Sequence, residues 1–525
     1  MSATKMTKSI SIARLFLAPV LALFLAATAH AAVPGITGPT FNLTAQTAFL
    51  NQPDGSSVYA WGYGCNGAPS GFAPSAIANA TCPNMQVPGP TLIVTEGQTV
   101  TVNLLNGLPA AAGNTSILFP GFNVTATGGV QGLLTQEAAP AGSVTYSFVA
   151  NSPGTHAYYS GSQSDLQVEM GMYGAVVVLP ATIPAACSAG LPVTNPGNNA
   201  AARAFWHESD FRLAPAAFDS SKSCYDREYL FQWAEMDSRI HTTALAQVTA
   251  CNGVSGCTLN VPTEPYHPAY FVINGRSMPD LMDANFAAEY PHQPYNGNPH
   301  MHPGELTLIR AIGQGRWQHP FHEHANHVRI LARDGNMILA PDGANLAGQL
   351  MFNTDTTPGE AFDGIFYFSG RGLNWDPYGH HPGDTKDASA SLPCTPDANG
   401  YNTVAPTAIN YFEWCQDHNK PLEVAPFGDV GAGGPATLPD PNIFTNGPWY
   451  GGTPYFGPDA TVRASAPTSN LQPANTQANP ANERGWAYMW HSHNEREITT
   501  NNVFPGGMLM MMLVDSREFV IDESN

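Results

Sequence analysis

The segment TLIVTEGQTVTVNLL, residues 91–105, decides the fold class. It contains two short runs rich in Val, Ile, Leu and Thr, separated by a turn that contains Gly97. Such runs predict β-strands rather than helices. Similar runs recur along the chain at 41–50, 57–61, 145–150, 174–179, 269–274, 305–312, 327–332, 362–368, 485–491 and 507–514. Strands at this spacing, punctuated by Gly and Pro, predict an all-β protein built from Greek-key β-sandwiches.

The length of 525 residues predicts two or three core-forming units. Only 11% of the residues are charged, whereas Gly and Pro number 50 and 46, which favours strands and turns over long helices. We expect a first sandwich at 32–182, a bridging region at 183–265 and a second sandwich at 266–525. An Asn-, Pro- and Gly-rich insertion at about 373–484 interrupts the second one. Three sandwiches are the alternative.

The first 31 residues have the pattern of a secretory signal peptide. Lys5, Lys8 and Arg14 form a basic start, Leu15–Leu25 is apolar, and Ala29-His30-Ala31 resembles a cleavage site. The alternative is an uncleaved anchor, but the apolar run is shorter than the roughly 20 residues of a spanning helix. We therefore expect an exported protein, periplasmic or secreted, with no membrane span.

The net charge excludes one class of partner. It is −20 for the full chain and becomes −23 once the signal peptide is removed. A surface this acidic repels nucleic acid. Eight cysteines in an exported chain predict disulfides. We expect nearest neighbours to pair, which gives Cys65–Cys82, Cys187–Cys224, Cys251–Cys257 and Cys394–Cys415.

Two histidine-rich segments carry the chemical signal. The first is HPFHEHANH at 319–327, and the second is WHSHNERE at 490–497. Alternate residues of a strand share a face, so His322 and His324 lie on one side, as do His491 and His493. If the two strands are neighbours, four imidazoles meet, and imidazoles suit copper, zinc, iron or nickel. We predict a metal site there.

These segments resemble the third and fourth copper motifs of the multicopper oxidases. VPGPTLIVTEG at 87–97 is similar to the opening strands of that family's first cupredoxin domain. QVEMGMYGAVVV at 167–178 resembles the segment after its second copper motif, and YFVINGR at 270–276 the start of a later domain. The resemblance implies tandem cupredoxin-like sandwiches, copper as the cofactor, and a small-molecule or metal-ion substrate. Two-domain relatives often form trimers, so a homotrimer is an expectation by analogy.

The departures from the family pattern matter as much as the matches. In the first copper motif, Leu118 and Pro120 stand where the family has histidines, and Tyr159-Ser160-Gly161 replaces the His-Ser-His of the second. Ser492 stands in place of the blue-copper cysteine. A serine hydroxyl stays protonated near neutral pH and is a poor soft ligand, so we expect no blue copper.

The resemblance then implies a reduced copper site. By position, His322, His324, His491 and His493 retain family ligands for one or two ions, with another transition metal as an alternative. His319, Glu497 and Met508 could form a second site for a harder ion, and a hydrogen-bonded polar remnant is the other interpretation. His300, His302 and His327 could supply replacement ligands, or they could be surface residues or residues that contact the ligands.

Three functions remain open at this point. The leading hypothesis is an exported, multicopper-oxidase-like oxidoreductase that works without a blue-copper site. The second is a non-catalytic protein that binds or delivers copper. The third is a metal-free scaffold of the same fold. No catalytic residue can be named from the sequence.

Overall fold

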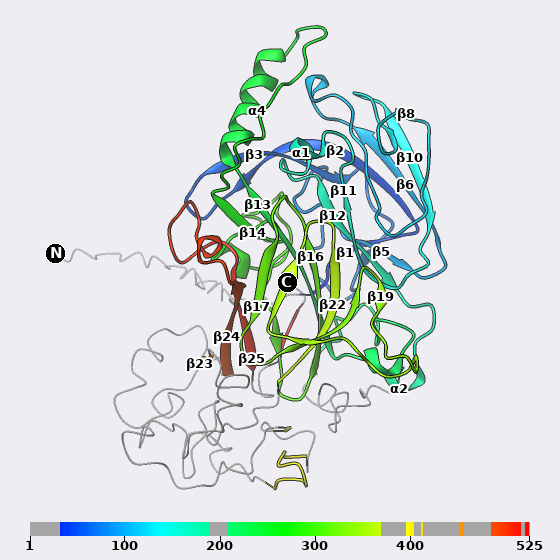
Figure 1. Cartoon of the computed structure of the whole chain (residues 1–525), viewed down its shortest axis with the longest axis vertical. Helices are drawn as coiled ribbons and strands as arrows, with labels where there is room; N and C mark the ends of the chain where they lie inside the picture. Colours follow the sequence, from blue (N-terminus) through cyan, green and yellow to red (C-terminus); the bar gives the residue numbers. More distant parts are fainter. Residues whose placement is uncertain are drawn as a thin grey trace, which may run out of the picture.

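The computed structural model describes residues 32–188, 203, 207–368, 395–403, 411–412, 452–455, 485–515 and 520–523. These residues form two β-sandwiches with few helices, which confirms the predicted all-β class (Figure 1). The expected signal peptide and the Cys394–Cys415 pair lie outside the described residues. No helix among the described residues is long and apolar enough to cross a membrane.

The first sandwich consists of two sheets, and the alternating burial of their strands explains the pairing. In β6 every second residue is buried, so one face covers a core and the other faces solvent. The first sheet has the order β3-β2-β6-β10-β7, with bounds Ser57–Cys65, Thr40–Asn51, Thr99–Asn106, Ser143–Val149 and Thr125–Thr127. The second has the order β11-β12-β5-β1-β4, with bounds Gly154–Tyr159, Tyr173–Leu179, Leu92–Thr95, Gly35–Thr37 and Phe72–Ala73.

The second sandwich also has two sheets. We number them as the third and fourth sheets of the chain. The third sheet has the order β14-β13-β16-β22-β18-β19, with bounds Tyr270–Ile273, Arg227–Met236, Leu306–Gly313, Ala361–Tyr367, Val328–Arg333 and Asn336–Met337, and β20 (Leu350–Met351) pairs with β18. The fourth sheet has the order β15-β25-β24-β17-β21, with bounds His300–Met301, Leu509–Asp515, Gly485–Ser492, His319–Glu323 and Asn353–Thr356, and β23 (Gly452–Tyr455) pairs with β24.

The four sheets stack as successive layers, and apolar side chains mark the contact between the sandwiches. Ala157 and Val177 of the second sheet pack against Leu230 and Ile312 of the third. The opposite face of the third sheet carries Phe231, which packs against the fourth sheet in a separate core. The fourth sheet is therefore the layer farthest from the first sandwich.

Strand β13 comes from the segment expected to bridge the two sandwiches. It pairs in parallel with β16 and antiparallel with β14, and all ten of its residues are buried. Helix α4, Ser238–Cys251, follows it and was not anticipated. Asp237 caps the helix by accepting a hydrogen bond from the backbone N–H of Arg239. Its buried Ile240 packs on the core of the first sandwich.

Three of the predicted disulfides are present, namely Cys65–Cys82, Cys187–Cys224 and Cys251–Cys257. In the region expected as an insertion, the described residues include β23, which adds an antiparallel strand beside β24. The domain boundaries proposed from the sequence remain predictions.

Candidate metal centre

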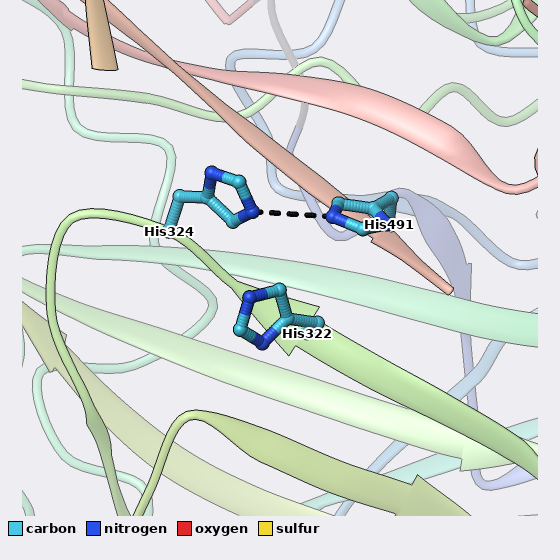
Figure 2. Close-up of side chains that lie close together, drawn as sticks. All are labelled: His322, His324 and His491. Carbon is cyan, nitrogen blue, oxygen red and sulfur yellow. Dashed lines mark hydrogen bonds between the residues drawn. The ribbon is translucent and has the colours of Figure 1, made fainter. Parts of the chain in front are cut away.

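Strands β17 and β24 bring the two histidine motifs together. They pair antiparallel, with His322 directly opposite His491. Figure 2 shows the imidazoles of His322, His324 and His491 turned toward one another. One ring nitrogen from each of the three lies within 4.8 Å of the other two. His493 joins them, with its ring centroid 4.8 Å from that of His322. The structure thus brings together three of the four residues predicted as metal ligands, and the ring of the fourth, His493, lies beside that of His322.

Alternation along the two strands explains why the imidazoles converge. Phe321 and Trp490 point into the core of the second sandwich, so their neighbours His322 and His491 must point to the other face. That face is the outer one of the fourth sheet. His322 is buried, His491 is partly exposed and His493 is exposed, so the cluster opens to the surface.

Backbone carbonyl groups fix the orientation of two rings. Nδ1 of His322 lies 2.5 Å from the carbonyl oxygen of Phe352, and Nδ1 of His491 lies 2.7 Å from that of Ser492. Each Nδ1–H donates to its carbonyl, which places the lone pair of a neutral imidazole on Nε2. Metal-bound histidines in proteins are oriented in this way. Nε2 of His491 lies 3.1 Å from Nε2 of His324.

Burial favours the neutral form of two of these imidazoles, His322 and His491. Burial lowers the pKa of His322 to about 4, and the three neighbouring imidazoles add to the effect. Burial also lowers the pKa of His491, with His493 contributing. Neutral imidazole is the form that binds metal. Two Nε2 atoms 3.1 Å apart are compatible with one shared ion, because metal–nitrogen distances in zinc sites are roughly 2.0–2.1 Å. The residues present therefore fit a transition metal.

The predicted second site contains a hydrogen-bonded network. Nδ1 of His319 lies 2.9 Å from Oε2 of Glu497, and Nε2 lies 2.9 Å from Oε2 of Glu235. Burial alone would lower the pKa of His319, but the two carboxylates raise it to about 9. The Ser492 hydroxyl donates to the same Glu497 oxygen at 2.5 Å. Both ring nitrogens of His319 are thus engaged by carboxylates, which fits the alternative of a polar remnant.

Met508, the third residue of that predicted site, contacts the network through its backbone. Its N–H donates to the carbonyl of Glu497 at 2.8 Å, and its carbonyl accepts from Ser492 N–H at 3.0 Å. The Met508 side chain is buried in the apolar core of the second sandwich. Metal binding at His319, Glu497 and Met508 remains a prediction.

Glu235 is the residue of this network that sequence reasoning missed. It lies on β13, in the segment assigned to the bridge. Its other oxygen, Oε1, accepts backbone N–H groups of Arg316 and Trp317 at 2.8 and 3.0 Å. A carboxylate near the end of the apolar run YLFQWAEM, residues 229–236, was the available signal.

The other histidines considered as ligands take different positions. Nδ1 of His300 lies 2.5 Å from Oδ2 of Asp515, and Nε2 of His302 lies 2.9 Å from Oε2 of Glu208. His327 packs beside Phe352, with ring centroids 5.3 Å apart. Among the described residues, only His322, His324 and His491 form a group of three or more side chains that could hold a metal ion.

The positions at which the family pattern has further histidines lie in the first sandwich. Leu118 forms a bridge with Tyr159 on β11. Tyr159 in turn lies beside Gly359, which belongs to the loop before β22. The buried Tyr158 packs among aromatic residues of the first core and donates to the carbonyl of Pro90 at 2.8 Å.

Comparison with known proteins supports the resemblance noted in the sequence. Residues 72–182 match the family model of multicopper oxidases. The chain is 37% identical over 100 residues to the multicopper oxidase MCE of Talaromyces pinophilus, a match that spans 18% of this chain and 16% of that protein. These findings show that residues 72–182 are similar to a multicopper oxidase domain, within a chain built from tandem β-sandwiches.

Solved structures with similar chains include the multicopper oxidase mgLAC, with 14% identity, a TM-score of 0.43, and coverage of 92% of this chain and 88% of that one. Another is a blue copper oxidase from Nitrosomonas europaea, with 15% identity, a TM-score of 0.42, and coverage of 90% and 85%.

Proposed function

We propose that this chain is an exported copper protein in which His322, His324 and His491 hold one ion, with His493 at the open side. The observation that supports this most directly is the 3.1 Å separation between Nε2 of His324 and Nε2 of His491, beside a third imidazole. The hydrogen bonds from Nδ1 of His322 and His491 to backbone carbonyls support it further. Copper is favoured over other transition metals because the family match points to it.

The proposed activity is oxidoreduction at this single centre, without a blue copper. When bound, copper would supply one-electron redox chemistry and an open position for a substrate. The protein's part is to keep His322 and His491 neutral, to orient their Nε2 atoms, and to leave one side accessible through the exposed His493. Small phenols or reduced metal ions are the proposed substrate classes.

Delivery of copper without turnover is the second candidate function, and the exposure of His493 is the observation that favours it. An ion bound at an open site can exchange with a partner. Export is part of both proposals, and the basic and apolar start of the chain together with the disulfides supports it. A homotrimer remains a prediction.

The test is metal analysis of protein purified from its native compartment, on the wild type and on the variants H322A and H491A. We expect about one copper per chain in the wild type and strong loss in both variants. H267A is a matched control, because His267 is exposed and belongs to neither histidine motif. Equal copper content in all four proteins would refute the proposed site.

Oxygen consumption with phenols, ferrous iron or manganese(II) then separates the two functions. An oxidoreductase consumes oxygen in proportion to its copper content, and H322A abolishes this. A carrier binds copper but consumes no oxygen with any of the three substrates. A wild-type protein that contains no transition metal would leave only the scaffold hypothesis.

A further inference from the structure

Two methionines lie beside the histidine cluster on the same face of the fourth sheet. Met489 is two residues before His491 on β24, so their side chains share the outer face. Across β25, Met489 is directly opposite Met511. On the other side, the backbone N–H of His324 donates to the carbonyl of Met489 at 3.2 Å, which continues the pairing of β17 with β24.

The pairing of the three strands therefore produces two adjacent rows. One row runs from His322 through His491 to Leu509, and the next runs from His324 through Met489 to Met511. Side chains directly opposite each other on paired strands have Cβ atoms roughly 4.5–5.5 Å apart, within reach of a long thioether. Two thioethers and the imidazole of His324 thus occupy neighbouring positions.

The exposure of these methionines differs from that of their neighbours on β25. Met489 is 39% exposed and Met511 is partly exposed, whereas Met510 and Met512 on the opposite face are fully buried in the apolar core. Core packing therefore accounts for Met510 and Met512. It accounts less well for Met489 and Met511, which lie on the outer face between the buried Leu509 and Leu513 and retain exposed thioether surface.

We propose that Met489 and Met511, together with His324, form a binding position for copper(I) at the edge of the histidine cluster. This inference rests on the proposed copper function and adds to it a position that favours the reduced ion. Thioether sulfur is a soft ligand that selects copper(I), whereas a cluster of imidazoles alone also suits copper(II). The two rows together offer nitrogen donors on one side and sulfur donors on the other, so that the protein binds the reduced ion as well as the oxidised one.

The experiment compares copper(I) and copper(II) affinities of the full mature chain. Copper(I) is measured anaerobically by competition with bathocuproine disulfonate, and copper(II) by competition with a chelating amino acid. The test protein is the double variant M489L/M511L, because leucine keeps the volume and removes the sulfur. M337L is the matched control, since Met337 lies on β19 of the third sheet.

We expect the double variant to bind copper(I) at least about tenfold more weakly than the wild type, with copper(II) affinity unchanged within about twofold. X-ray absorption of the copper(I)-loaded wild type should show sulfur scatterers, which the double variant lacks. M337L should behave as the wild type in both assays. Copper(I) affinity unchanged in M489L/M511L, or a wild-type spectrum with nitrogen neighbours only, would overturn the proposal.

The variant H322A distinguishes this failure from that of the proposed function. If the histidine cluster binds copper but the methionines do not, H322A weakens copper(II) binding and M489L/M511L has no effect on copper(I). If the cluster is not a copper site, H322A leaves copper(II) binding unchanged, whatever the methionine variants do.

Discussion

The two carboxylates that hold His319 predict a pH dependence of stability. The pKa of His319 is raised from an ordinary value of 6.5 to about 9 in the folded state. A raised histidine pKa means that the protonated ring stabilises the folded protein. This contribution is fully present below pH 6.5 and is lost as the pH rises through 9. The shift corresponds to roughly 3 kcal/mol of unfolding free energy.

The variant E497Q removes one of the two carboxylate charges and leaves Glu235 in place. We expect the pKa of His319 to fall toward its ordinary value, and about half of the pH-dependent contribution, roughly 1.5 kcal/mol, to disappear. The assay is urea unfolding of copper-free protein between about pH 6 and pH 10, followed by tryptophan fluorescence. E495Q is the matched control, because Glu495 is exposed two residues away on the same turn.

Subtraction of the control cancels the titration of groups that all the proteins share. The E497Q curve should lie below the E495Q curve near pH 6 and approach it near pH 10. Parallel curves across this range would refute the reasoning, because they would mean that Glu497 does not stabilise a protonated His319.

Three further predictions concern other parts of the molecule. R310M should lower the unfolding free energy measured with urea by roughly 3–5 kcal/mol, because Arg310 is buried between Glu228 and Asp363 and its loss leaves two buried carboxylates without their cation. A decrease below about 1 kcal/mol would contradict this. E323L should raise the urea midpoint near pH 7. The reason is that burial raises the pKa of Glu323 well above its usual range, and its carboxylate oxygens have no hydrogen-bond partner among the described residues. A lower midpoint would show an undetected partner of this carboxylate. Copper-loaded protein should show no intense absorption near about 600 nm, because no thiolate is available at Ser492; such a band would show that a cysteine binds the copper.

The sequence was sufficient to predict the strands, and it predicted the convergence of the histidines on the condition that their two strands are neighbours. Apolar alternation is a local property, and two HxH motifs on neighbouring strands have only one face on which to meet. The predicted strand at 305–312 corresponds to β16 at Leu306–Gly313, and the one at 485–491 to β24 at Gly485–Ser492. The three disulfides within the described residues also follow the expected nearest-neighbour pairing.

The role of β13 and its Glu235 could not be predicted, because it depends on contacts distant in sequence. Trp233 pairs with Gly313, some 80 positions along the chain, and the carboxylate of Glu235 meets His319 only through that pairing. Helix α4 has a local signal in the sequence. Asp237 precedes Ile240, Ala244 and Val248, whose four-residue spacing is helical.

His322 and His491 lie on two adjacent strands of a single sheet, and His324 and His493 are the first residues after these strands. Their mutual spacing is therefore set by one ladder of backbone hydrogen bonds and does not depend on how the two sandwiches are oriented. Rocking of one sandwich against the other would leave the donor atoms in register. An isolated second sandwich, if it folds, should carry the complete histidine set.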